Sequence, residues 1–368
     1  MSNKNNLNQI EEVTAVQGEE NVSAEETAVT LELPPEEKFT LDGARRKVKQ
    51  FLRKIKFDKW KAWIYLSPAI ILLLIFTVWP IINTVRMAFI NGYNRMAEIN
   101  PDGYTPVFGI QNFIDVVTFD NFGTCLKNTV LLCVLTVPIS TILALLIAVA
   151  LNSIKPLQRF LQTIFFLPYV TNSIAIGMVF SAMFTMVGSF IGGPREKIIT
   201  AGIINNIIEA LGFEKVNWMN PGSKYWANIT VMVIYIVWNA LPFKILILLG
   251  GLQSVNKQYY EAAKVDGTSR TRIFTRITVP LLSPMIVYVV ITGFIGGFKE
   301  YSSIVGVFGE TMGPTGSYKS LNTMVGFIYD AIESNTQGKA SAAALILFAI
   351  ILVVTLINLR ISKKNTHY

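Results

Sequence analysis

The sequence is short of charged residues, cysteine and histidine. Asp, Glu, Lys and Arg make up 15% of the 368 residues, whereas a soluble domain carries about a quarter. Cys125 and Cys133 would lie about 12 Å apart on one helix, too far for a disulfide. The one histidine, His367, lies at the tail. A soluble domain, a disulfide framework and a His/Cys metal site are therefore not expected.

Several motifs are absent as well. The sequence contains no Gly-x-x-x-x-Gly-Lys-[Ser/Thr] stretch, so it has no phosphate-cradling loop of its own. The apolar segments hold no His-rich, paired-carboxylate or Ser–His constellation, which argues against a membrane enzyme. An inverted repeat and mid-span ionisable residues, which a carrier acting alone more often has, are not evident.

What the sequence does have is apolar length. Hydrophobic residues reach 52% and the mean hydropathy is +0.46. Six nearly uncharged windows approach the roughly 20 residues that cross a bilayer: 63–82, 129–151, 160–184, 228–249, 281–298 and 342–359. These windows predict an all-α integral membrane protein with about six transmembrane helices. Segment 198–211 is shorter and carries polar residues, so it is expected to be an amphipathic helix that does not span.

Basic residues predict the orientation. Lys and Arg gather in segments 44–61, 153–159, 252–278 and 360–368. The alternate loops, 90–127, 186–226 and 302–339, have fewer for their length. Because cytoplasmic loops carry the excess of Lys and Arg, both termini are expected on the cytoplasmic side of the membrane.

Three regions are predicted along the chain. Residues 1–43 are polar and acidic and are expected to be a disordered tail. Residues 44–61 place apolar side chains at helical spacing among cations, as in a juxtamembrane amphipathic helix. A basic flank that only fixes topology fits them equally well. Residues 62–368 are expected to be the transmembrane domain.

A charged stretch interrupts the apolar chain at residues 261–284, EAAKVDGTSRTRIFTRITVPLLSP. It predicts two short helices, with Gly267 ending the first. Ile273, Phe274 and Ile277 share one face of the second, and Pro280 is expected to stop it before the next span. The small residues beside Glu261 suit close approach by another protein.

This stretch resembles the EAA loop, here about 252–280, of bacterial ABC importer membrane subunits, with Val279 where Leu is usual. Segments such as FGIQNF, RFLQTIFFLPYV and FIGGFKEYSSIVGVF are similar to carbohydrate permeases of the maltose type. The resemblance implies that the loop docks in a cytoplasmic ATPase, which binds the ATP and Mg, so this chain would hold no cofactor. The residues expected to couple are Glu261, Ala262, Ala263, Asp266, Gly267, Ile277 and Pro280.

The resemblance also implies partners and a substrate path. The partners would be an ATPase dimer, a second permease in a heterodimer, an extracytoplasmic sugar-binding protein and membrane lipid, with no nucleic acid. The path candidates are Asn172, Trp238, Asn239, Phe243, Gly297 and Glu300. Phe243 aligns with an aromatic position that contacts sugar in maltose-type relatives. An ordinary kinked helix, whose Asn bonds its neighbour, accounts for the sequence WNALPF equally well. Lys244 is interpreted as a structural residue. Lys299 is interpreted as a residue whose charged end snorkels to the membrane interface.

The function expected on this basis is the permease subunit of an ATP-driven oligosaccharide importer. The alternatives left open are a permease for another solute, such as glycerol phosphate, and a secondary transporter that acts alone.

Overall fold

The computed structural model describes residues 49, 61–96, 106–154, 160, 162–164, 169, 171–189, 197–314 and 316–365. The predicted acidic tail, residues 1–43, and most of segment 44–61 lie outside these ranges. The chain divides into two units, Met1–Leu72 and Leu73–Tyr368, and the second holds most of the described residues.

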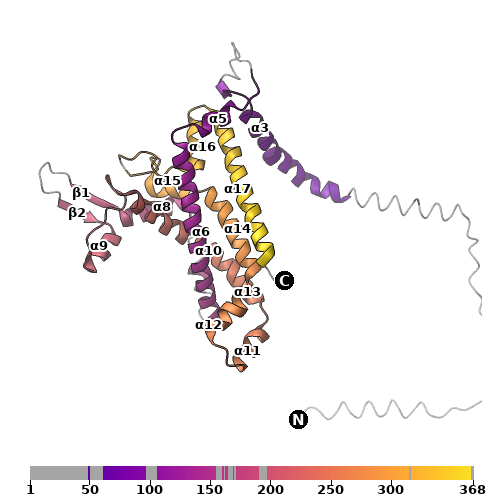
Figure 1. Cartoon of the computed structure of the whole chain (residues 1–368), viewed down its shortest axis with the longest axis vertical. Helices are drawn as coiled ribbons and strands as arrows, with labels where there is room; N and C mark the ends of the chain where they lie inside the picture. Colours follow the sequence, from indigo (N-terminus) through magenta and orange to yellow (C-terminus); the bar gives the residue numbers. More distant parts are fainter. Residues whose placement is uncertain are drawn as a thin grey trace, which may run out of the picture. The chain divides into compact units, whose positions relative to one another are not determined.

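Helices dominate the described part of this unit (Figure 1). In chain order the elements are η1 (Leu74–Val78), α3 (Trp79–Ala88), α5 (Gln111–Val117), α6 (Phe122–Ser153), α8 (Ser173–Phe184), β1 (Met186–Ser189), β2 (Lys197–Ala201), α9 (Ile203–Ala210), α10 (Tyr225–Ser254), α11 (Lys257–Val265), α12 (Arg270–Ile273), η2 (Phe274–Thr278), α13 (Val279–Leu281), α14 (Ser283–Phe298), α15 (Ser302–Phe308), α16 (Met324–Glu333) and α17 (Gln337–Asn365).

The membrane spans largely follow the hydropathy prediction. Among the described residues, four helices are long and apolar enough to cross a bilayer: Lys61–Ala88, Phe122–Ser153, Tyr225–Ser254 and Gln337–Ser362. A fifth span is possible if Arg270–Leu281 and Ser283–Phe298, which meet at a 68° bend, count as one. The predicted third span, 160–184, is described only in part, and its longest described helix is the twelve-residue α8. The described residues therefore hold four or five spans and leave the predicted sixth untested. The helical membrane architecture itself is confirmed.

The prediction for segment 198–211 is wrong at its start. Strands β1 and β2 pair antiparallel, with Met186 opposite Ala201, and α9 begins only at Ile203. Consecutive β-branched residues in IIT favour a strand over a helix. The inward side of α9 mixes apolar and polar groups: Asn205 is buried and bonds Val216 and Trp218. Ile204 and Ile208 are partly buried beside it, whereas Asn206 and Glu209 are exposed.

Three long helices form the centre of the fold. α10 packs along α6, and α14 packs on both. Both α6 and α10 run unbroken through an internal proline, Pro138 and Pro242. The buried face of α6 carries hydroxyl and amide side chains that bond its own carbonyls or the neighbouring segments. A polar stripe therefore lies inside an otherwise apolar bundle.

Candidate functional site

The charged stretch forms the predicted hairpin, at the end of the helices where α11 and α12 lie (Figure 1). The side chain of Asn256 caps α11 by accepting a hydrogen bond from the Gln258 amide at 3.0 Å. At the other end the Thr268 amide donates to Ala263 O at 2.9 Å and the Gly267 amide to Lys264 O at 3.1 Å. These two bonds are a Schellman turn, whose left-handed residue is Gly267 at φ +66°.

The hairpin presents one side to solvent and buries the other. Glu261 and Ala262 are exposed, as is Val265, with 89% of its surface accessible. Ala263 is buried within the chain at 6%, so of the two alanines only Ala262 can meet a partner directly. An exposed Val beside a small residue and a carboxylate suits docking by another protein.

The prediction that Pro280 ends the second helix is wrong. The chain stays helical from α12 through η2 and α13, and it breaks at Leu282, where the 68° bend leads into α14. Proline removes an amide donor and its ring clashes with the carbonyl four residues earlier. The wider π turn of η2, immediately before Pro280, accommodates this. Ile273, Phe274 and Ile277 are partly buried as predicted, whereas Arg272 and Arg276 are exposed.

A cavity of about 290 Å³ lies where α6, α10 and α14 meet. Four of the six predicted path residues line it: Asn239, Phe243, Gly297 and Glu300. The structure thus brings together side chains from two helices that the sequence separates by more than fifty positions. The cavity is small enough that one or two rings of a small polar solute would fill it.

Aromatic and amide groups shape the wall on α10. Phe243 stacks on Tyr169, with ring centroids 5.9 Å apart and planes at 18°. The Asn239 amide is half-buried and makes no hydrogen bond within the described chain. An aromatic face beside a free amide is a combination that can bind a ring bearing hydroxyls.

Lys244 also lines the cavity, and sequence reasoning placed it outside the path. It is 4% exposed, and its Nζ donates to Ser140 Oγ at 2.7 Å, Thr141 Oγ1 at 2.9 Å and Val137 O at 3.2 Å. All three ammonium protons are therefore used in joining α10 to α6. These bonds agree with the interpretation of Lys244 as a structural residue. Its place in the cavity wall was not predicted from the sequence.

Two predicted path residues lie elsewhere. Asn172 lies outside the helical residues as the N-cap of α8, where its side chain accepts from the Ile174 amide at 2.9 Å. Trp238 packs on Phe180 in the apolar core, with centroids 5.2 Å apart. The neighbouring Ser173 bonds the Tyr235 hydroxyl at 3.0 Å, which agrees with the interhelical hydrogen bonding favoured for this cluster.

The adjacent glycines Gly296 and Gly297, near the end of α14, have different roles. A Cβ at Gly297 would lie 2.8 Å from Cys133 Sγ, so this position is where α14 touches α6. A Cβ at Gly296 would meet nothing within 4 Å, and Gly296 borders the cavity. Glu300, beyond the end of α14, accepts a hydrogen bond from the Ser303 amide at 3.2 Å.

Comparison with known proteins identifies the class. The family described as "Binding-protein-dependent transport system inner membrane component" matches residues 137–367, and the chain belongs to this family. It is therefore a multi-pass membrane permease component, and not an enzyme. The predicted resemblance to carbohydrate importer permeases is confirmed by its relatives.

Two relatives illustrate this. The arabinooligosaccharides transport system permease protein AraP of Bacillus subtilis is 31% identical over 303 residues, 82% of this chain and 88% of the relative. The lactose transport system permease protein LacF of Rhizobium radiobacter is 27% identical over 299 residues, 80% and 91% of the two chains. The fold is also that of a chain from a bacterial ABC transporter that imports alginate, with a TM-score of 0.68 at 21% identity, over 86% of this chain and all of that one.

Proposed function

We propose that this chain forms the translocation path of an ATP-driven importer for an uncharged oligosaccharide. The observation that carries the proposal is the cavity between α6, α10 and α14, with the aromatic ring of Phe243 and the free amide of Asn239 in its wall. The names of the related permeases for lactose and arabinooligosaccharides support a sugar.

The charge of the cavity favours an uncharged substrate over glycerol phosphate. A phosphate would need cationic donors that are free to bind it. The ammonium of Lys244 has all its protons engaged by oxygens of α6, and Lys299 is exposed outside the cavity lining. Sugar hydroxyls require only neutral donors and acceptors, which Asn239 and Thr292 provide.

We further propose that the α11–α12 hairpin is the contact with a cytoplasmic ATPase, which places both termini in the cytoplasm. Glu261 would pair with a basic group of the ATPase, Ala262 would permit close approach, and the turn at Gly267 would set the angle between the helices. A second permease chain and an extracytoplasmic sugar-binding protein would complete the complex. A related fold was solved with a periplasmic protein bound to alginate pentasaccharide.

The first experiment is purification in mild detergent, identification of the proteins that copurify, and assay of ATP hydrolysis with sugar-loaded binding proteins. Glu261→Lys combined with Gly267→Pro should abolish ATPase copurification and uptake while the protein still reaches the membrane. A chain that purifies alone and moves solute without ATP would refute the proposal and favour a secondary transporter.

The path is tested separately at Phe243. Phe243→Ala should lower uptake by up to about tenfold, since ring stacking contributes roughly 0.5–1.5 kcal/mol. Phe243→Tyr keeps the ring and should retain uptake. Equal uptake by wild type and Phe243→Ala would exclude the cavity wall from sugar binding.

A further inference from the structure

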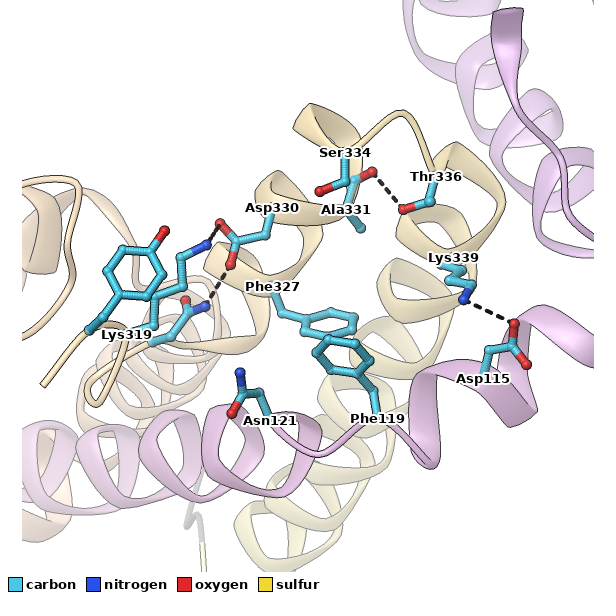
Figure 2. A pocket seen from close by; sticks show the side chains of 12 residues that line it. Asp115, Phe119, Asn121, Lys319, Phe327, Asp330, Ala331, Ser334, Thr336 and Lys339 are labelled. Atoms are coloured by element: carbon cyan, nitrogen blue, oxygen red, sulfur yellow. Dashed lines mark hydrogen bonds and ion pairs between the residues drawn. The ribbon is translucent and has the colours of Figure 1, made fainter. Parts of the chain in front are cut away.

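A second hollow of about 340 Å³ is lined by residues of α5, α16 and α17 (Figure 2). These elements meet at the end of the bundle opposite the hairpin (Figure 1). We call it the outer pocket. Its walls come from α5, the turn between α5 and α6, the segment before α16, α16 itself and the start of α17. They include Phe119, Asn121, Asn322, Phe327 and Ser334. Its volume lies within the range of small-molecule sites, about 300–1,000 Å³.

One side of the outer pocket is a bonded set of polar groups. Lys319 Nζ lies 2.8 Å from Asp330 Oδ1, and Asn322 Nδ2 donates to Asp330 Oδ2 at 2.9 Å. Burial alone would lower the pKa of Lys319, but its interactions with Asp330 and Tyr318 outweigh that effect and raise the pKa. The Lys319 and Asp330 side chains remain 21% and 23% exposed, so their orientation is fixed while an edge of each stays accessible.

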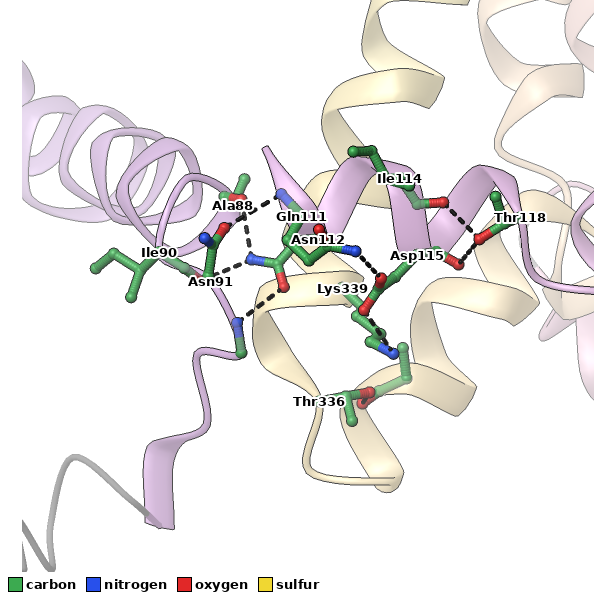
Figure 3. Close-up of polar contacts among 12 residues, drawn as sticks. Ala88, Ile90, Asn91, Gln111, Asn112, Ile114, Asp115, Thr118, Thr336 and Lys339 are labelled. Atoms are coloured by element: carbon green, nitrogen blue, oxygen red, sulfur yellow. Dashed lines mark hydrogen bonds and ion pairs between the residues drawn. The ribbon is translucent and has the colours of Figure 1, made fainter. Parts of the chain in front are cut away.

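The opposite side is fixed by a second ion pair. Lys339 Nζ lies 3.1 Å from Asp115 Oδ2, and Gln111 Nε2 donates to Asp115 Oδ1 at 2.7 Å (Figure 3). Asn112 ties α5 to the turn after α3 through bonds to Ala88 O and Ile90 O. The two lysines of the pocket match its two aspartates, so the pocket offers no unpaired charge to an ionic ligand.

Groups able to bind a neutral ligand remain. The side chains of Asn121 and Ser334 are exposed and make no hydrogen bond to the described residues. The Phe119 ring is 52% exposed and meets Phe327 edge to face at 5.6 Å. A free apolar ring among unpaired hydroxyl and amide groups is what a sugar requires.

The outer pocket adjoins the membrane cavity. Thr323, directly after Asn322, donates to Glu300 O at 2.8 Å, and Glu300 lines the cavity. Asn322, in the wall of the pocket, and Thr323, which bonds the residue beyond the end of α14, are thus consecutive in the chain. A sugar end in the outer pocket would therefore lie near Glu300, with the buried Thr323 between them.

We propose that the outer pocket is a second saccharide subsite, which binds one end of an uncharged sugar before it enters the cavity. Phe119 supplies the stacking face, and Asn121 and Ser334 supply hydrogen bonds. This inference rests on the proposed function, because a sugar must be the transported solute.

The test measures protection of single introduced cysteines. Ser334→Cys and Asn121→Cys place thiols in the pocket at exposed positions, while Glu214→Cys places one at an exposed position outside it. The native thiols, Cys125 and Cys133, are fully buried. Maleimide modification is followed in the reconstituted complex with maltotriose, arabinotriose or lactose, using whichever sugar the wild type transports.

Protection should follow mass action. At a sugar concentration ten times Kd, modification at positions 334 and 121 should slow by about tenfold, with no change at position 214. Phe119→Ala in the Ser334→Cys background should remove the protection, and Phe119→Tyr should keep it.

The possible failures are distinguishable. A wild type that transports no sugar refutes the proposed function. A wild type that transports sugar without slowing modification at positions 334 and 121 refutes only the subsite. Protection by the binding protein alone, equal with and without sugar, would make the outer pocket a protein docking surface and overturn the inference.

Discussion

Substitution of Gly267 by Ala isolates the geometry of the α11–α12 turn. A Cβ at this position would meet no atom within 4 Å, so the substitution creates no clash within the chain. The cost is conformational, because φ is +66° and the left-handed region costs a residue with a Cβ about 1–2 kcal/mol. That amount corresponds to a roughly 5- to 30-fold larger population of the open turn.

The opened turn should be visible directly. The amides of Gly267 and Thr268 are the donors of the Schellman bonds, so their hydrogen exchange should accelerate in Gly267→Ala by the same factor. Gly267→Asn should show a smaller effect, since Asn tolerates this conformation better. Gly250→Ala is the matched control, because Gly250 lies within α10 with open space around its Cβ position and ordinary helical geometry.

The consequence for transport follows from the proposed coupling. In the reconstituted complex Gly267→Ala should lower the sugar taken up per ATP hydrolysed, and Gly250→Ala should not. Faster exchange with an unchanged transport ratio would show that the hairpin angle does not couple the two activities. Unchanged hydrogen exchange at these two amides would contradict the expected cost of the left-handed conformation for Ala.

Three further predictions concern other contacts. Ser140→Ala removes one acceptor from the buried ammonium of Lys244 and should lower the free energy of unfolding by about 1.5–3 kcal/mol. The same substitution should cost much less in a Lys244→Met background. Thermal melts of the wild type, the two single variants and the double variant measure this difference. Gly297→Ala should destabilise by about 1–3 kcal/mol through overpacking against the thiol of α6. Gly296→Ala should keep stability and reduce uptake, and equal melting of the two glycine variants would contradict the packing argument. Finally, the hydrogen bond from Gln111 and the ion pair with α17 lower the pKa of Asp115. Its stabilising contribution is therefore present above about pH 4 and lost as pH falls through the lowered pKa. Melting temperatures between pH 7 and 3 should fall more steeply for wild type than for Asp115→Asn.

Local features of the fold could be predicted from the sequence because their causes are local. The spans follow from apolar length, and the end of α11 follows from one glycine. The β1–β2 pair was missed because a short Ile-rich run fits a helix or a strand equally well. Asn172 was placed mid-span because the apolar window continues through it, whereas a cap side chain depends on the backbone of the next two residues.

The site needed long-range information. Asn239 and Phe243 were selected by their place in one helix, and nothing in the sequence shows that Ser140 faces Lys244 across 104 positions. The outer pocket likewise depends on α5, α16 and α17 meeting, and its residues carry no motif. The contacts between helices that are distant in the sequence could therefore be found only from the structure.

One element links the two ends of the protein. α14 begins at the bend that follows the hairpin and ends two residues before Glu300, which borders both the cavity and the segment carrying the outer pocket. Its sixteen residues span about 24 Å at 1.5 Å per residue. Gly297 holds α14 against α6 on one side, and Gly296 leaves it open to the cavity on another. We therefore expect a displacement of α12 and α13 to reach the cavity through the movement of one rigid helix, without a relay of side chains.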